Sequence, residues 1–144
     1  MKDLDVARDH LYRQGLNLVI VKDGSVLFET RSHRISGFVG AIEKVGMKLE
    51  GAAVADKVVG KAIALLCVHA AIAEVYAEIL SVKAKSLFEE KGIKHEWKEL
   101  IDNILDLKKS GICPFERLAT TISDPKNAYE SFRALQKSLE KRHS

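Results

Sequence analysis

The sequence predicts an α/β fold of three layers, in which a mixed β-sheet lies between helices. Three observations lead to this prediction: an amphipathic helical segment opens the chain, a β-hairpin follows it, and helical and strand-like segments then alternate. Such alternation is typical of sheets that contain parallel strands covered by helices. Because no linker, repeat or low-complexity segment divides residues 1–144, we expect a single domain.

The N-terminal elements have clear local signals. Residues 3–14 place Leu4, Ala7 and Leu11 on one helical stripe, and Gly15 follows as a stop signal.

Two β-rich runs come next, over residues 16–21 and 25–30, joined by Lys22-Asp23-Gly24. Asp-Gly is typical of a type I′ hairpin turn. The first run is apolar on both faces, which predicts a central strand that is covered on two sides.

The middle of the chain begins with a polar loop over residues 30–37 and a helix over 38–46. A run of small residues, 51–55, then leads to Asp56. Since residues 58–68 are almost entirely apolar, we expect there a helix that is buried on most sides.

The second half alternates strands and helices. Residues 73–80 alternate as a strand, and Ser81 is expected to cap a helix that ends at Gly92. Residues 93–97 have a weak strand pattern, and 100–108 suggest one or two helical turns. A final helix is expected to start at Ser123-Asp124-Pro125 and to place apolar residues at helical spacing up to Leu139.

The segment Gly111-Ile112-Cys113-Pro114-Phe115-Glu116 combines one of two cysteines with one of two prolines. Proline suits the first turn of a helix, so Cys113 is expected at the N-cap and Glu116 at N3, from which a carboxylate can fold back on the cap. A thiol at a helix N-terminus meets unpaired N–H groups, which favour the thiolate. Cys113 is therefore a candidate nucleophile or redox thiol; the alternative is an unreactive cap.

A second candidate site is the run Asp56-Lys57-Val58-Val59-Gly60-Lys61-Ala62. If Asp56 caps the buried helix, Lys57 and Lys61 share a helix face, and Gly60 lets a ligand or another backbone approach. Backbone N–H groups and two ammonium groups would then meet an anion. The alternative is a capped helix with two solvated lysines.

Helix starts after strands tend to meet at one edge of an α/β sheet, where ligands bind. The starts expected at Asp56/Lys57, Ser81 and Cys113 would bring a carboxylate, two ammonium groups, a hydroxyl and a thiol together. For Ser81 alone, a plain N-cap is the stronger interpretation.

Composition argues against several classes of protein. A net charge of +3 is too small for a dedicated nucleic-acid surface, and no apolar run is long enough to cross a membrane. The first residues do not form a signal peptide, and two cysteines are too few for a secreted disulfide framework, which favours the cytoplasm. The five histidines are scattered, and no Cys-x2-Cys occurs, so neither a metal nor another cofactor is expected. A homo-oligomer is compatible with the sequence.

The segments 55–62 and 111–116, with 73–81 between them, resemble the DUF1893 family of uncharacterised bacterial and archaeal proteins. The resemblance implies a cytidine-deaminase-like fold. Active zinc deaminases carry His-Ala-Glu at one helix start and Pro-Cys-x-x-Cys at the next. Here the corresponding residues are expected to be Ala55-Asp56-Lys57 and Ser81-Val82-Lys83-Ala84, which supply no zinc ligands.

The resemblance therefore implies a rebuilt pocket around Asp56, Lys57, Lys61, Ser81 and Cys113. Two hypotheses follow. In the first, the pocket holds a small anionic or nucleotide-like ligand, with Cys113 as nucleophile or redox thiol. In the second, the protein is a non-catalytic binding or regulatory module that recognises a nucleotide, RNA or a protein partner.

Overall fold

A mixed sheet of five strands forms the centre of the fold, with the strand order β2-β1-β3-β4-β5. The computed structural model describes residues 2–32, 34–105 and 111–143. The strands are β1 (Leu18–Lys22), β2 (Ser25–Thr30), β3 (Ala53–Val59), β4 (Glu74–Ser81) and β5 (Lys94–Ile101). β1 is antiparallel to β2 and β3, whereas β3, β4 and β5 are parallel to one another.

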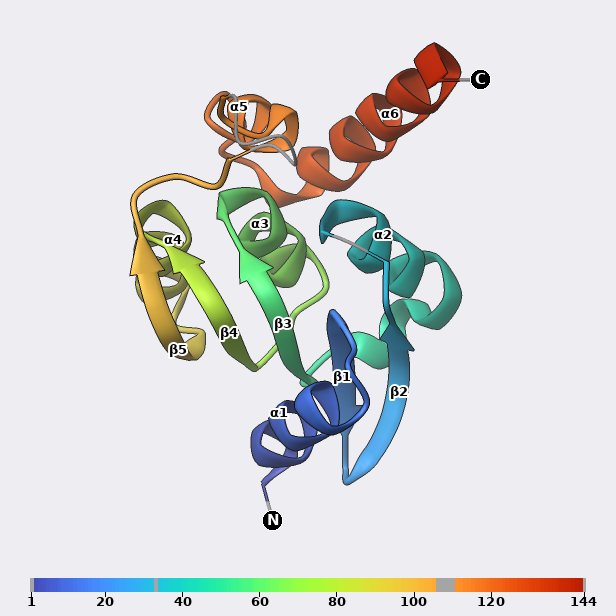
Figure 1. The fold of residues 1–144 in the computed structure, drawn as a ribbon, viewed down its shortest axis with the longest axis vertical. Coiled ribbons are helices and arrows are strands. Elements are labelled where there is room, and N and C mark those ends of the chain that lie inside the picture. The colour runs from blue at the N-terminus through green and yellow to red at the C-terminus, as the bar shows by residue number, and fades with distance from the viewer. Residues whose placement is uncertain (1, 33, 106–110, 144) are drawn as a thin grey trace.

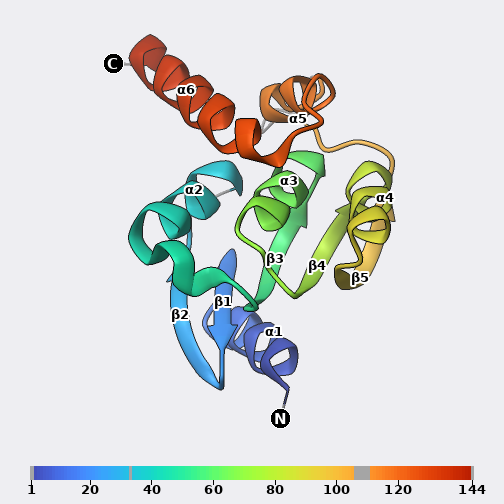
Figure 2. The same ribbon diagram turned by 180° about the vertical axis from the view of Figure 1, so that it is seen from behind.

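Helices cover both faces of this sheet, so the predicted α/β architecture with a mixed sheet is confirmed (Figures 1 and 2). One face carries α1 (Asp3–Arg13), which packs on β1, β3 and β4. The other face carries α2 (Arg34–Val45), α3 (Lys61–His69) and α4 (Val82–Lys91). A short 3-10 helix, η1 (Gly46–Leu49), follows α2.

Two further helices lie beyond the carboxyl ends of the parallel strands, at the top of Figure 1. They are α5 (Pro114–Ala119) and α6 (Pro125–His143), and α6 packs against α3. Asp124 Oδ1 accepts a hydrogen bond from the N–H of Lys126, which confirms the predicted start of the last helix. In the described part of the chain, no helix has the length and the apolar character needed to cross a membrane.

The apolar core has two parts, one on each face of the sheet. Beneath α1, the side chains of Leu4, Ala7 and Leu11 pack with residues that include Val19 and Val21. On the opposite face, Leu18 and Ile20 belong to the larger cluster with the fully buried phenylalanines, which are Phe38, Phe88 and Phe132. The prediction that the first strand is central and covered on both sides is therefore confirmed.

The predicted hairpin is also confirmed, since Asp23 and Gly24 adopt φ values of 52° and 79° between the paired residues Lys22 and Ser25. Positive φ at both central residues is the requirement of a type I′ turn. Asp3 of α1 secures the turn, because its two carboxylate oxygens accept from the N–H groups of Asp23 and Gly24 at 2.9 and 2.8 Å.

The most important difference from the sequence prediction is β3. Residues 53–59 form a strand, and the buried helix starts only at Lys61, with Gly60 at its N-cap. A short apolar run that is buried on both faces has the same pattern in a strand and in a helix, so periodicity alone could not separate them. The small side chains Ala53 and Ala55 fit beneath α1.

A second difference concerns residues 100–108. Leu100 and Ile101 end β5, and Leu105 forms an isolated bridge with Ile112, so the predicted helical turns are wrong there. Residues 106–108 of that prediction lie outside the described residues. Elsewhere the expected strands β4 and β5 are confirmed, and the expected helix over 38–46 is present but begins earlier, at Arg34.

Candidate functional site

The candidate site lies where the three parallel strands end. The carboxyl ends of β3, β4 and β5 meet α5 and the first turns of α3 and α4 at this edge (Figure 1). Ligands of open α/β sheets bind outside the carboxyl ends of the strands, because helix N-termini and loops supply polar groups there. Position alone therefore singles out this edge as the candidate.

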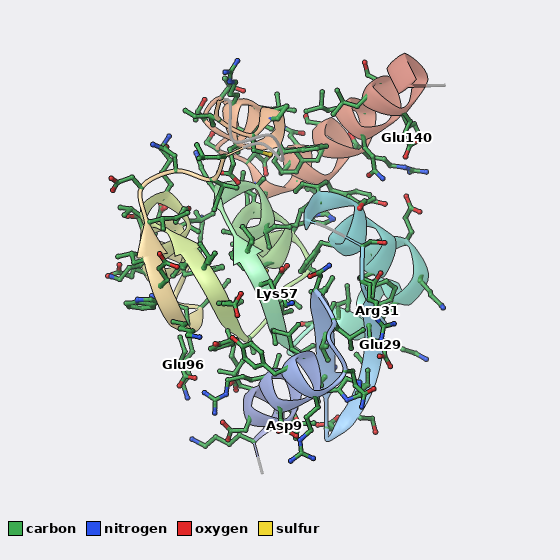
Figure 3. All side chains as sticks on the ribbon, viewed as in Figure 1. Asp9, Glu29, Arg31, Lys57, Glu96 and Glu140 are labelled. Atoms are coloured by element: carbon green, nitrogen blue, oxygen red, sulfur yellow. The ribbon has the colours of Figure 1, made fainter. Side chains whose placement is uncertain are left out.

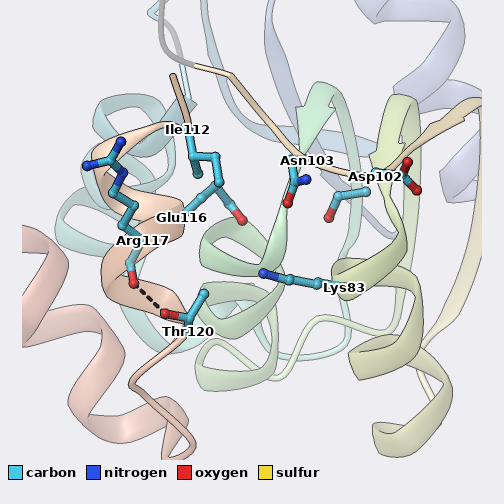
Figure 4. A pocket seen from close by; sticks show the side chains of 8 residues that line it. Lys83, Asp102, Asn103, Ile112, Glu116, Arg117 and Thr120 are labelled. Carbon is cyan, nitrogen blue, oxygen red and sulfur yellow. Dashed lines mark hydrogen bonds between the residues drawn. The ribbon is translucent and has the colours of Figure 1, made fainter. Parts of the chain in front are cut away.

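A pocket of about 230 Å³ opens at this edge. It is lined mainly by polar side chains: Ser81, Lys83, Asp102, Asn103, Ile112, Glu116, Arg117 and Thr120. In Figure 4 the polar ends of Lys83, Asn103 and Glu116 point toward one another across it, whereas the guanidinium of Arg117 points away. The Lys83 ammonium thus faces the centre of the pocket.

Ser81 connects the pocket to α4. Its hydroxyl oxygen accepts a hydrogen bond from the N–H of Ala84 at 3.1 Å, and the side chain is buried. The predicted N-cap is therefore confirmed, as is the C-terminal stop, because Gly92 adopts the left-handed conformation. The hydroxyl group also lines the pocket, and its proton stays available for donation because the cap uses only the oxygen.

Glu116 ties α5 to the start of α3. Its two carboxylate oxygens accept from the N–H groups of Lys61 and Ala62, each at 3.0 Å. The expectation that Glu116 folds back on its own helix is wrong, because the N–H of Cys113 donates to the carbonyl of Ile104 instead. A carboxylate on two backbone N–H groups at a helix N-terminus is stabilised by the hydrogen bonds and by the helix dipole.

Gly60 is required by this arrangement. A Cβ atom at residue 60 would overlap the Glu116 carboxylate, so no larger residue fits while the carboxylate stays in place. A close approach at Gly60 is expected from the sequence and is present, but the group that approaches is the Glu116 side chain and not a ligand or another backbone. Lys61 contributes its backbone N–H here, and its side chain does not line the pocket.

Cys113 occupies the N-cap of α5, as predicted, but its thiol makes no capping hydrogen bond. The residue is only 5% exposed. It lines a much smaller and mainly apolar cavity next to the pocket, together with residues such as Val58, Ile63 and Phe115. The thiol is therefore not among the groups that line the larger pocket.

Asp56 and Lys57 lie in β3 and not at a helix start, so the predicted cap and the shared helix face of Lys57 and Lys61 are wrong. Neither residue lines the two cavities. Lys57 lies on the sheet (Figure 3), and its N–H donates to the carbonyl of Asn17. The structure thus separates these two residues from Ser81, Cys113 and Glu116.

The Asp56 carboxyl is buried in the sheet and only partly hydrogen-bonded. Oδ1 accepts from the N–H of Val58 at 3.2 Å, whereas Oδ2 has no partner among the described residues. Burial raises the pKa of Asp56 from 3.8 to about 7, and the backbone hydrogen bonds oppose this only in part. The nearby Cys67 thiol is also buried, and its pKa is raised by burial and by the charge of Asp56.

The two helix starts at this edge carry side chains that do not fit a zinc ion. α3 begins with Lys61-Ala62-Ile63, not with the expected Ala55-Asp56-Lys57, and α4 begins as expected after Ser81. Zinc sites in proteins use thiolate, imidazole and carboxylate ligands. Within the described ranges, no three His, Cys, Asp or Glu residues come together in a way that could hold a metal ion.

Sequence reasoning did not find most of the pocket. Asp102 and Asn103 follow β5, but the apolar spacing over residues 100–108 predicts helical turns, which place these two residues away from a strand end. Lys83 is the second residue of α4. Its position just after the predicted N-cap, Ser81, is the sequence feature that could have indicated a place at the pocket. Thr120 follows a helix of only six residues and carries no such signal.

Comparison with known proteins gives a family for most of the chain. The model of a domain of unknown function, DUF1893, matches residues 6–136. The structure of a DUF1893 family protein from Thermotoga maritima superposes with a TM-score of 0.84 and 27% identity, over 93% of this chain and 90% of that one. No curated protein matches the chain.

More distant structural likenesses concern the fold alone. RibD from Acinetobacter baumannii, in its form 1, superposes with a TM-score of 0.50 and 20% identity over 83% of this chain. The present chain spans 35% of that RibD chain. A structure from a study of tRNA:A34 deaminases superposes over 75% of this chain with 19% identity and a TM-score of 0.42.

Proposed function

The chain belongs to the DUF1893 family, and we propose that it is a small-molecule-binding protein whose ligand carries an anionic group and occupies the pocket between α4 and α5. The observation that carries the proposal is the pocket of about 230 Å³ at the carboxyl edge of the parallel strands, with the Lys83 ammonium pointing into it. An edge of this kind is where α/β sheets hold ligands.

The lining suits a small ligand with an anionic group. Lys83 supplies a positive charge, and the amide of Asn103 and the hydroxyl of Ser81 supply neutral donors. Glu116 accepts hydrogen bonds from two N–H groups at the start of α3, and these partly offset its negative charge. A volume below the roughly 300–1,000 Å³ of drug-sized pockets favours ligands of the size of a nucleoside or sugar phosphate.

This proposal gives Cys113 no contact with the ligand, because the buried thiol faces the apolar cavity. It therefore favours the binding-module hypothesis over thiol catalysis. If Cys113 were the nucleophile, Cys113→Ser would abolish turnover, and iodoacetamide would modify the thiol below the pH at which ordinary thiols react. Under the binding proposal, Cys113→Ser binds the ligand as the wild type does.

The proposal is tested by calorimetry and thermal-shift measurements with inorganic phosphate, ribose 5-phosphate, AMP, CMP and the matching nucleosides. We expect binding of phosphate-bearing compounds, weakened about ten- to a hundredfold in Lys83→Met, because a charge-assisted hydrogen bond contributes about 1.5–3 kcal/mol. The matched control is Lys91→Met at the other end of α4, which keeps the affinity. Equal affinity of wild type and Lys83→Met, or no binding by any compound, contradicts the proposal.

A further inference from the structure

β5 forms one edge of the sheet, and that edge is open. It pairs with β4 on one side, and no strand of the described chain pairs with the other (Figure 1). Trp97 and Leu100 of this strand are 39% and 42% exposed. An exposed edge of eight residues presents unpaired N–H and C=O groups to any strand that can align with it.

We propose that β5 pairs with the β5 of a second copy of this chain, antiparallel, with the two Trp97 side chains facing each other at a two-fold axis. A two-fold axis perpendicular to the sheet always relates such edge strands in antiparallel orientation. The pairing would join the two sheets into one continuous sheet. This inference is independent of the proposed ligand pocket.

Backbone geometry leaves few alignments for this pairing. Only alternate residues of an edge strand direct their N–H and C=O groups outward, so the axis must pass through a residue and not between two residues. An axis at Glu96 places Glu96 opposite the Glu96 of the second copy, and Lys94 opposite its Lys98. An axis at Lys98 or at Glu99 likewise places that charged residue opposite the same residue of the second copy. Like charges that face each other destabilise a strand pair. An axis at His95 brings together little more than residues 94–96.

The axis at Trp97 avoids every like-charge pair and overlaps the strands from Lys94 to Leu100. On one face it sets Glu96 opposite the partner's Lys98, and by symmetry Lys98 opposite the partner's Glu96. On the other face it sets His95 opposite the partner's Glu99. Opposite charges in facing positions stabilise a strand pair, so charge complementarity selects this alignment.

The surroundings of Trp97 hold its ring in place. The Lys85 ammonium lies 5.4 Å from the ring centroid, and the His95 ring stacks at 5.8 Å with an interplanar angle of 18°. Glu96 forms an ion pair in its own chain, with 3.8 Å between its Oε2 atom and Nη1 of Arg8. That contact is long and exposed, so it does not prevent Glu96 from meeting a second cation.

Charged residues on an edge strand ordinarily keep copies of a protein apart. In β5, the charged residues disfavour each alignment that pairs most of the strand, except the alignment with the two-fold axis at Trp97. We therefore expect a specific dimer and not open-ended association, because the β5 edge of each copy is then paired and cannot bind a third copy.

Sedimentation velocity over a dilution series of the full chain tests the proposal. We expect the wild type to dimerise, and Lys98→Glu or Glu96→Lys to weaken the dimer at least about tenfold by placing like charges opposite each other. The double variant Glu96→Lys/Lys98→Glu restores the opposite charges and with them the dimer. The control Lys94→Glu, in the same strand and on the same face, meets Leu100 and leaves the dimer intact.

A second measurement reads the interface directly. Trp97 is the only tryptophan, so its fluorescence emission is expected to shift to shorter wavelength as the dimer forms. In the variant Trp97→Cys the two thiols would face each other at a separation that a disulfide spans, and oxidation should yield a covalent dimer. Lys98→Cys, whose facing residue is Glu96, should yield much less. Cys67 and Cys113 are buried and do not compete.

Three results would overturn the proposal. The first is a wild-type chain that stays monomeric at every concentration. The second is a dimer that Lys98→Glu does not weaken or that the double variant does not restore. The third is equal cross-linking of Trp97→Cys and Lys98→Cys, which would indicate random collision of the edges.

Discussion

At the scale of single residues, Asp56 is an unusual group because its carboxyl is buried without an ion-pair partner among the described residues. The residue is 3% exposed and lies in the middle strand of the sheet, and Oδ2 of its carboxyl has no partner among the described residues. Burial of an ionised carboxyl is unfavourable, and the raised pKa of about 7 expresses this. The protonated form is therefore the one that suits the folded protein.

The stability of the protein should consequently depend on pH through Asp56. Since the pKa is 3.8 in the unfolded chain and about 7 in the folded one, this contribution is complete below pH 4 and is lost as the pH rises toward 7. The full loss, which is reached above pH 7, is on the order of 4.5 kcal/mol, because the pKa differs by about three units and one unit corresponds to about 1.4 kcal/mol. Urea denaturation at a series of pH values measures it.

Asp56→Asn isolates this contribution from that of the other titrating groups. The amide cannot ionise, so the variant does not lose this contribution. Its unfolding free energy should therefore rise relative to that of the wild type as the pH increases from 4 to 7. Asp102→Asn replaces an exposed carboxyl and serves as the control. Parallel pH profiles for Asp56→Asn and the wild type would show that Asp56 does not titrate in this range.

At the scale of elements, the contact between α5 and α3 decides which residues surround the pocket. Glu116 brings α5 onto the first turn of α3, and Gly60 leaves the room that it needs. Gly60→Ala should therefore displace the carboxylate and lower the unfolding free energy by about 1–3 kcal/mol, since the buried N–H of Ala62 and the partly buried N–H of Lys61 lose their acceptor. Chemical denaturation measures the loss.

A double-mutant cycle tests the cause of that loss. In a Glu116→Ala background the carboxylate is absent, so Gly60→Ala should have little further effect. The matched control is Gly40→Ala in α2, where a Cβ would lie 3.7 Å from Phe28 in ordinary contact and no loss is expected. Additive losses from Gly60→Ala and Glu116→Ala would contradict the steric explanation.

The elements that could be predicted from the sequence are those with local chemistry. The Asp23-Gly24 turn and the helix between Ser81 and Gly92 depend on residues close to one another in the chain, and both are confirmed. β3 could not be recognised, because only its neighbours β1 and β4 distinguish it from a buried helix. The same distinction holds in the candidate site. The N-caps at Ser81 and Cys113 depend on local sequence and could be predicted, whereas the contact of Glu116 with the start of α3 depends on residues far apart in the chain and could not.

At the scale of the whole molecule, the sheet consists of two different halves. The antiparallel half, β1 and β2, is secured by Asp3 and α1, and the parallel half carries the pocket and the open edge of β5. The ligand and the second copy are thus proposed at neighbouring places, because β5 leads directly into Asp102 and Asn103. The two proposals can nevertheless fail separately, since each has its own variants.

The bond between Glu116 and α3 also has a consequence for the order of folding. It joins residues 55 positions apart, so a long stretch of chain must be ordered before it can form. We expect it to be absent from the transition state. Glu116→Gln, whose amide nitrogen cannot accept a hydrogen bond, should then accelerate unfolding and leave the folding rate unchanged in stopped-flow measurements. A slower folding rate would place the contact in the nucleus. On the expected order, the two halves of the sheet assemble first and α5 closes over the finished edge last.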